Sequence, residues 1–490
     1  MGRNAKIYTV FIGPGYDTAR LHFRRSVMGP DGVRIPKSFL SNKDLLQKLR
    51  SALPDIEFVS RDLEPSPKGY DRLLMEIREL KDELDGVMLI GGHAIRRFAL
   101  SDTEQQPLAF TGLPTIAVDN LFKLQPHPYE TFAQKGKIIT ACVDREAILA
   151  PDKSEAMDDD LLGKIRIIGA LAKMKRARIL LIQDPQTEID KEDFKIFPPK
   201  YNETTIDHMH ETFGVEFITR DVAGLAKAYE EAGDKEAKKI AKMWIDESEG
   251  LKDTTEDEVV KSARLYLAIE EIIKECGEVS AVMIQGRLQD AGIDAHKSLP
   301  MMELQKRGVI ACYQSYTGTT LAQMLAYYMV GRMSFVHDSV IDVFNNVTLH
   351  MHCGCPIRYV WGDKDLPYKI RDYTTGKWHE ELKRRDGAVP GEVEFPVGVP
   401  ATIWKVLVNL NEITVYTGTS IDGNSLYKEW DDIICRNKLA LKVENAERIQ
   451  NHRNVHKYGC HQTATFGDLR KKIKQLATFI GFDVVEEDVT

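Results

Sequence analysis

Histidine and cysteine side chains are dense in one short stretch of the chain, TLHMHCGC, at 348–355. It contains His350, His352, Cys353 and Cys355, and imidazole and thiolate groups are the ligands that zinc prefers in proteins. The stretch has the character of a β-strand, in which alternate side chains point to opposite faces. We therefore expect His350 and His352 on one face and Cys353 on the other. The two histidines could therefore face one site together, which the cysteines could not easily join. Four ligands from one strand cannot surround a zinc ion, so the alternative is one histidine facing a metal site assembled from several segments.

Two other catalytic patterns are incomplete in this sequence. The segment GPGYDT at 13–18 has the form G-x-G-x-x-T, which lacks the third glycine of a dinucleotide-binding loop and the lysine of a P-loop. A turn is the simpler interpretation of these residues. The chain also has no G-x-S-x-G motif, so a nucleophilic serine of the hydrolase type is not indicated.

Composition limits the classes of function further. A chain of 490 residues with 43% hydrophobic and 29% charged residues is typical of a soluble globular protein with several domains. The net charge of −8 gives no reason to expect nucleic acid as a partner. No apolar run approaches the roughly 18 residues of a membrane span, and the N-terminal residues lack the apolar core of a signal peptide. The seven scattered cysteines do not suggest a disulfide framework, so we expect a reducing, cytoplasmic location.

The first half of the sequence alternates apolar strand patterns with helical patterns. The alternation begins with KIYTVFIGP at 6–14, continues through a helical segment to IEFVSRDL at 56–63, and reaches DGVMLIGGH at 85–93. Alternation of this kind is typical of a parallel sheet covered by helices. The pattern restarts near residue 165 and continues to SAVMIQG at 280–286 and an apolar helix at 321–331.

Beyond residue 345 the sequence becomes rich in strand patterns separated by Gly, Pro and Asn. We therefore predict two Rossmann-like, parallel-sheet α/β domains and a C-terminal, mainly antiparallel β domain. The expected domains are an N-terminal α/β domain at 1–165, a second α/β domain at 166–345, and a β-rich domain at 346–490. The last of these should end with a helix in GDLRKKIKQLATFIGF at 467–482.

Two motifs, in the right order, resemble the L-fucose isomerase and L-arabinose isomerase superfamily. The first is ACYQSYTGTTLAQMLAYYMVGRMSFVHDSVIDVFNNVTLHMHCGC at 311–355, in which Gly331 and Asp338 keep the spacing of that family. The second is GCHQTATFGDLRKKIKQLATFIGFDVVEED at 459–488, where His461 precedes a Gly-Asp pair, a helix and a VVE segment. The helix and strand at 263–286 are also similar, and Gln285 matches a glutamine of the family's substrate pocket.

The resemblance implies a divalent ion, usually Mn²⁺, held by a Glu, an Asp and a His. Asp338 matches the Asp and His461 matches the His. An ungapped match places Gln314 at the Glu position, and a shift of one residue places Tyr313 there; neither is a carboxylate. The asparagine that often precedes the His in fucose isomerases is Cys460 here. Because a His in the region of TLHMHCGC ligates the metal in arabinose isomerases, His352 is a further candidate ligand, or a hydrogen-bond partner of one.

The chemistry implied by the family is aldose–ketose isomerisation through an enediolate. The ion polarises the sugar carbonyl, and carboxylates move the proton. An amide at 314 could ligate a metal but could not act as a base, so Asp338, His337 or Tyr316 would have to supply one. Three functions stay open: an isomerase with an altered site, a metal-assisted elimination, epimerisation or bond cleavage on a sugar derivative, and a non-catalytic sugar-binding paralogue.

The substrate expected from the resemblance is a small carbohydrate. Gln285, Tyr313 and His350 are the candidate contacts within the subunit. Relatives assemble as homo-trimers or homo-hexamers in which the first domain of a neighbour covers the pocket. In such an assembly Arg20, or its neighbours Arg24 and Arg25, could reach the substrate of the adjacent subunit; an exposed basic cluster without a ligand is the alternative.

Overall fold

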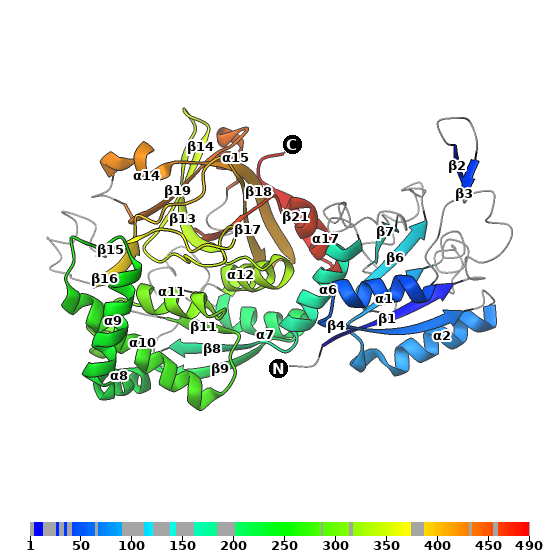
Figure 1. The fold of residues 1–490 in the computed structure, drawn as a ribbon, viewed down its shortest axis with the longest axis horizontal. Coiled ribbons are helices and arrows are strands. Elements are labelled where there is room, and N and C mark those ends of the chain that lie inside the picture. The colour runs from blue at the N-terminus through cyan, green and yellow to red at the C-terminus, as the bar shows by residue number, and fades with distance from the viewer. Residues whose placement is uncertain are drawn as a thin grey trace. The chain divides into compact units, whose positions relative to one another are not determined.

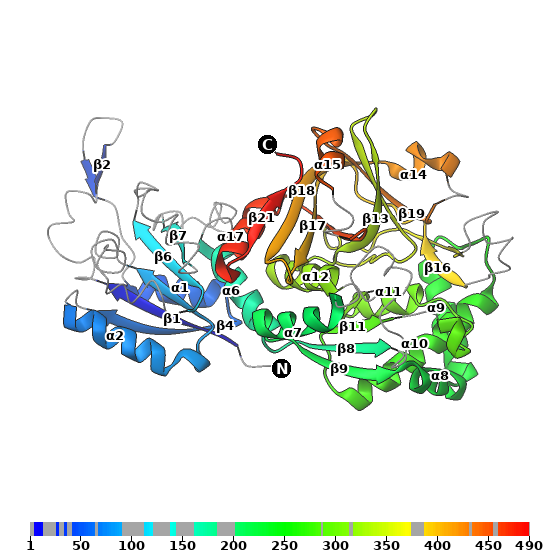
Figure 2. The ribbon, with the colours of Figure 1, turned by 180° about the vertical axis from the view of Figure 1, so that it is seen from behind.

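The structure is a computed structural model, and the chain in it divides into two compact units. Unit 1 comprises Met1–Lys173 and Lys471–Asp483, and unit 2 comprises Met174–Arg470 and Val484–Thr490. Figures 1 and 2 show the elements of both units. No helix among the described residues is long and apolar enough to cross a membrane. The described residues are 4–12, 26–28, 34–36, 42–63, 67–90, 112–120, 138–143, 161–183, 201–285, 288–312, 317–373, 387–430, 434–453 and 459–489.

Unit 1 is built on a five-stranded parallel sheet with the order β4-β1-β5-β6-β7. Its strands are β1 (Ala5–Ile12), β4 (Ile56–Leu63), β5 (Gly86–Ile90), β6 (Thr115–Asn120) and β7 (Ile138–Val143). Parallel neighbours require crossover connections, and helices supply them before β4 and β5. The helices of the unit are α1 (Asn42–Ala52), α2 (Pro67–Glu79), the short η2 (Lys81–Glu83), α6 (Gly163–Met174) and α17 (Arg470–Ile480), and a small hairpin joins β2 (Ser26–Met28) to β3 (Arg34–Pro36).

Unit 2 contains a second parallel sheet, with the order β12-β11-β8-β9. Its strands are β8 (Arg178–Gln183), β9 (Glu216–Asp221), β11 (Ala281–Ile284) and β12 (Ile310–Cys312). Asp221 ends β9 and caps the next helix, because its side chain accepts a hydrogen bond from the Ala223 amide. The helices of this part are α7 (Tyr201–Phe213), α8 (Val222–Glu231), α9 (Asp234–Glu247), α10 (Glu256–Cys276), η8 (Leu288–Ala291) and α11 (Ser298–Lys306).

The larger sheet of unit 2 is mainly antiparallel and closes on itself. Its strands follow the order β17-β20-β13-β14-β19-β18-β21, and β17 also pairs with β18 along its whole length. This extra pairing turns the sheet into a barrel, whose alternate side chains point inward and outward. The strands are β13 (Phe335–Asp342), β14 (Val347–His352), β17 (Pro400–Leu407), β18 (Glu412–Ile421), β19 (Asn437–Lys442), β20 (Gln462–Phe466) and β21 (Asp483–Glu486).

Smaller elements complete the unit. They are the strands β10 (Leu251–Lys252), β15 (Lys369–Asp372) and β16 (Ala388–Gly391), which form a three-stranded sheet, and the short helices α14 (Gly423–Leu426), η9 (Lys428–Trp430) and α15 (Ala446–His452). Two parallel-sheet α/β regions and an antiparallel region confirm the predicted fold class. The second and third expected domains lie together in unit 2, because one hydrophobic core contains both Ile284 of β11 and Tyr416 of β18.

Helix α12 (Thr317–Val330) packs between the parallel sheet and the barrel. It contacts β12 on one side and β17 and β20 on the other, and its side chains are buried from Thr317 to Ala326. The helix approaches β17 closely at Gly318, where a Cβ atom would overlap the Val406 carbonyl oxygen. A residue without a side chain is therefore needed at this contact.

We expect Gly318→Ala to lower the free energy of unfolding by about 1–3 kcal/mol, because the added methyl forces α12 away from β17. Denaturant unfolding followed by circular dichroism measures the change. Gly224→Ala is the matched control: apart from the adjacent backbone of α8, no atom of the described residues lies within 4 Å of a Cβ placed at that position. It should be neutral or stabilising by up to about 1 kcal/mol. Equal unfolding midpoints for the two variants would contradict the tight contact.

Candidate metal centre

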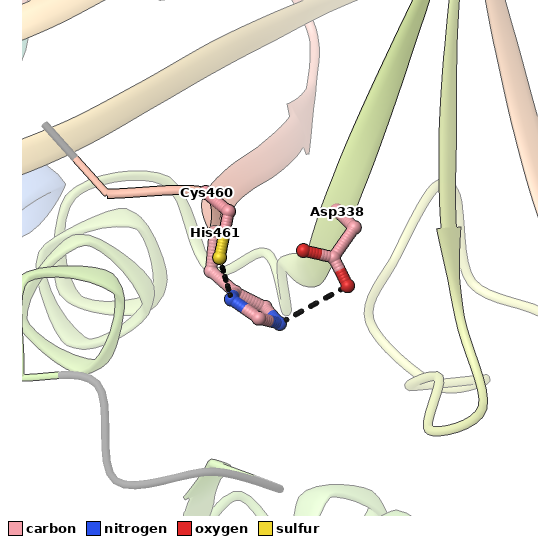
Figure 3. Close-up of side chains that lie close together, drawn as sticks. All are labelled: Asp338, Cys460 and His461. Carbon is pink, nitrogen blue, oxygen red and sulfur yellow. Dashed lines mark hydrogen bonds and ion pairs between the residues drawn. The ribbon is translucent and has the colours of Figure 1, made fainter. Parts of the chain in front are cut away.

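The pairing of β13 with β20 brings Asp338 and His461 together. His337 pairs with Gln462 in this antiparallel ladder, so the next pair in the same register is Asp338 and His461. Directly opposite residues project from the same face, and here the His461 Nε2 atom lies 3.3 Å from Asp338 Oδ2. Figure 3 shows the imidazole directed at the carboxylate.

Cys460 adds a sulfur atom to this pair. Its Sγ lies 3.1 Å from His461 Nδ1, on the opposite side of the ring from Asp338 (Figure 3). Asp338, Cys460 and His461 each offer one donor atom, and these atoms lie within 4.8 Å of one another. The His461 side chain is 5% exposed, whereas that of Asp338 is 40% exposed. The cluster therefore has a buried imidazole and a carboxylate that solvent can reach.

The electrostatics of the cluster favour a charged pair in the absence of metal. Burial alone would raise the pKa of Asp338, but the charge and hydrogen bond of His461 outweigh it and lower this pKa to about 2. Burial alone would lower the pKa of His461, but the Asp338 carboxylate raises it to about 10. Both groups are consequently ionised at neutral pH.

His352 lies beside this pair, at the end of β14. Its ring centroid is 5.7 Å from that of His461. Burial, with the nearby charge of His461, lowers the pKa of His352 to about 3, so the ring is neutral. Its Nδ1 accepts a hydrogen bond of 3.1 Å from the Gly354 amide, which places the ring proton on Nε2. In this tautomer the Nε2–H of His352 is a hydrogen-bond donor.

His350 belongs to a different cluster, inside the barrel. Its Nδ1 lies 3.2 Å from His337 Nδ1, and its Nε2 lies 2.9 Å from the Thr348 hydroxyl. Burial lowers the pKa of both His337 and His350 well below the usual value, so both rings are neutral. His350 and His352 were predicted to share one face of the strand, but their neighbours differ: Tyr416 also faces His350, whereas His461 faces His352.

Further polar groups connect the barrel interior to the metal-ligand candidates. Arg453 donates to the Ser339 hydroxyl at 2.8 Å and to the Cys460 carbonyl at 2.7 Å. The buried Glu487 accepts a hydrogen bond of 3.0 Å from Gln462, and burial raises its pKa. His337 Nε2 is also buried, and no hydrogen-bond partner is found for it among the described residues.

Gln285 sits at the carboxyl end of β11, beside β8. The strand order reverses at this pair, and such a switch point is where ligands bind in open α/β sheets. The Gln285 side chain is buried, yet within the described part of the chain neither its Oε1 nor its Nε2 has a hydrogen-bond partner. Buried amides are normally satisfied, so this one is suited to a ligand hydroxyl.

Sequence reasoning overlooked His296 and Lys297, which precede the buried helix α11. Lys297 Nζ donates to the Ile284 carbonyl at 2.9 Å, next to Gln285, and its charge helps to lower the pKa of His352. His296 stacks on Tyr373 with ring centroids 4.4 Å apart. The only signal in the sequence was a charged and a titratable residue side by side in DAHKS at 294–298.

Several predicted residues cannot be placed. Arg20, Arg24, Arg25, Tyr313, Gln314 and Tyr316 lie outside the described residues. Asp468 is described, and its carboxylate accepts a hydrogen bond of 3.1 Å from the Arg470 amide at the start of α17. This residue therefore caps a helix.

The described donors fit a divalent cation. A carboxylate, an imidazole and a thiol converge, and His461 Nε2 and Asp338 Oδ2 are separated by 3.3 Å. Two ligands at about 2.1 Å from an ion, at a tetrahedral angle, are about 3.4 Å apart. The pair thus has the spacing that a shared ion requires.

Comparisons with known proteins do not assign a family. No protein-family description and no curated protein matches the sequence. Matching solved structures include a protein from Mycobacterium smegmatis (8% identity, 67% of this chain and 86% of that one, TM-score 0.15) and a periplasmic sugar-binding protein of an ABC sugar transporter from Legionella pneumophila (11%, 67% and 96%, TM-score 0.15). A third is an ABC transporter solute-binding protein from Bacillus halodurans C-125 with bound myo-inositol (13%, 68% and 91%, TM-score 0.17). Superpositions this poor support no inference about fold or function.

In metal-free protein, we expect Asp338→Asn to lower the pKa of His461 from about 10, because the carboxylate that favours the imidazolium is lost. Histidine NMR titration measures it. Because the pKa of Asp338 is lowered and that of His461 is raised, the ion pair stabilises the fold fully between about pH 3.8 and 6.5, and this contribution is lost as pH falls through about 2 or rises through about 10.

Asp342→Asn is the control for this titration. Asp342 lies on the same strand, but its carboxylate bonds to Asn345 and Tyr427, so the pKa of His461 should not move. If Asp338→Asn also left that pKa unchanged, the ion pair between β13 and His461 would be disproved.

Proposed function

We propose that the protein is a divalent-metal-dependent, sugar-active enzyme of the fucose isomerase-like type, which interconverts an aldose and a ketose through an enediolate. The observation that carries the proposal is the position of Asp338 opposite His461. These two residues were matched to the metal ligands of the superfamily from separate motifs, and the strand register makes them neighbours. The Asp338 side chain is 40% exposed, so a ligand can reach it.

The roles of the side chains follow from their surroundings. Asp338 and His461 would hold the ion, which supplies a Lewis acid for the sugar carbonyl and its neighbouring hydroxyl. With Nδ1 of His352 accepting from the Gly354 amide, its Nε2–H would be the group that donates to a developing negative charge on a sugar oxygen. The amide of Gln285 can donate to one hydroxyl and accept from another, and so fixes the orientation of the sugar.

The proton that moves between the two sugar carbons needs a base. His337 and His350 are neutral, but burial keeps their pKa values well below the usual range, so they are weak bases. Asp338 is ionised and accessible, and we assign it the proton transfer. Its low pKa makes it a weak base too, so we expect turnover to be slow compared with a site that has a second carboxylate.

A second candidate function rests on residue 314. The sequence has an amide where the superfamily has a carboxylate, so the site would have one acid–base carboxylate instead of two. A single carboxylate and an enolate-stabilising ion can support elimination, epimerisation or bond cleavage on a sugar derivative.

Exchange of substrate hydrogen with solvent separates these functions. With a divalent ion present, we expect deuterium from the solvent at C1 or C2 of at least one sugar in a panel of pentoses, hexoses and deoxy sugars. Asp338→Asn should lower the exchange rate at least ~100-fold, since both a ligand and the base are lost. Asp342→Asn on the same strand is the matched control and should retain the rate.

Gln314→Glu tests the effect of having an amide, rather than a carboxylate, at position 314. If the site is otherwise an isomerase site, the added carboxylate should raise the exchange rate about 10²-fold or more. Deuterium exchange at a carbon next to a carboxylate or a leaving group, with no exchange on any aldose, would favour the second candidate function. Tight sugar binding by calorimetry without exchange on any substrate would instead identify a sugar-binding paralogue.

A further inference from the structure

We infer that Cys460 is a thiolate ligand of the metal centre, and that the centre therefore selects a thiophilic ion such as Zn²⁺ or Co²⁺ over Mn²⁺. The inference rests on the metal dependence proposed above, but not on the reaction. It changes the expected ligand set from oxygen and nitrogen donors alone to a carboxylate, an imidazole and a thiolate.

The position of the sulfur is the first support. Cys460 Sγ is 3.1 Å from His461 Nδ1 and belongs to the same 4.8 Å cluster as the Asp338 carboxylate. Donor atoms around a tetrahedral ion with one thiolate are about 3.3–3.7 Å apart. Cys460 faces Nδ1 of His461 whereas Asp338 faces Nε2, and one ion binds only one ring nitrogen, so a change of side-chain rotamer has to bring all three donors to one ion. The thiol releases its proton to solvent as the sulfur–metal bond forms.

The backbone of Cys460 is also held in place. Arg453 donates from one guanidinium nitrogen to the Cys460 carbonyl and from the other to Ser339 of β13. This bridge ties the residue before His461 to the strand that carries Asp338. The ligand set is therefore fixed by two strands and one arginine, rather than by a free loop.

Charge compensation is the second support. The resemblance places Gln314 where a carboxylate is expected, which removes one negative charge from the metal shell. It places Cys460 where fucose isomerases often have a neutral asparagine, and a thiolate restores that charge. Exchanging a hard carboxylate for a soft thiolate keeps the charge but changes the preferred ion, because thiolates favour Zn²⁺ and Co²⁺, and oxygen ligands favour Mn²⁺.

Another thiol near the cluster provides an internal control. The charges of Asp338 and His461 both influence Cys435, but its thiol hydrogen-bonds with the buried Cys353. Cys435 is thus paired with a second sulfur, whereas Cys460 faces the imidazole. Replacement of either cysteine by serine removes one thiol from the same neighbourhood, so the two variants are closely matched.

Cobalt absorption tests the inference directly. Co²⁺ added to the metal-free, full-length protein under a non-thiol reductant should give the intense near-ultraviolet charge-transfer band of a cobalt–thiolate bond. Cys460→Ser should abolish this band, and Cys435→Ser should retain it. Zn²⁺ should displace the bound Co²⁺ at a concentration at least about tenfold lower than Mn²⁺ requires. Circular dichroism of each variant shows whether it is folded.

Cys460→Asn gives a second, independent variant. It should lose the charge-transfer band. In equilibrium dialysis, its affinity for Mn²⁺ relative to Zn²⁺ and Co²⁺ should be higher than that of the wild-type protein. The inference is overturned if Co²⁺ binds the wild-type protein without the band, or if the band survives in Cys460→Ser. The test of the reaction is separate. A cobalt–thiolate band with no hydrogen exchange on any sugar would contradict only the proposed function. Hydrogen exchange without the band would contradict only the thiolate ligand.

Discussion

The antiparallel pairing of β13 with β20 is the constraint on which the candidate site depends. Its register sets His337 against Gln462, and therefore Asp338 against His461. Two residues that are distant in sequence acquire a separation of 3.3 Å because the main-chain hydrogen bonds of the ladder fix it. A slip of one residue would turn one member of the pair to the other face of the sheet. Closure of the barrel and the packing of α12 against β17 and β20 oppose such a slip.

The same register divides the histidines of this region between two environments. Alternation along β13 sends His337 into the barrel and Asp338 out of it. The interior histidines contact each other and Thr348, where burial keeps them neutral. On the outer face the carboxylate keeps His461 charged. One strand thus supplies a neutral hydrogen-bonded interior and a charged, accessible cluster that can attract a cation.

Periodicity and composition were sufficient to predict the fold class, because buried parallel strands and alternating antiparallel strands have different patterns. The strand containing His350 and His352 was predictable for the same reason. Their neighbours were not, because these come from β13 and from the residue before β20, and periodicity carries no pairing information. The closed barrel was likewise not predictable, because it depends on the pairing of β17 with β18. The parallel sheet and the barrel share one core, with α12 between them, but their sequence patterns differ and therefore suggest two domains.

The character of the site follows from its charges. With Asp338 as the one described carboxylate in the cluster, an ion and a base compete for the same group. Ligation lowers the basicity of a carboxylate, so a site that uses Asp338 for both tasks sacrifices rate. A thiolate at Cys460 eases this conflict, because it supplies charge and affinity to the ion without taking part in proton transfer. The Asp338 carboxylate can then bind the ion weakly and remain available to the sugar, and this explains why a cysteine at 460 and an amide at 314 would occur together in one chain.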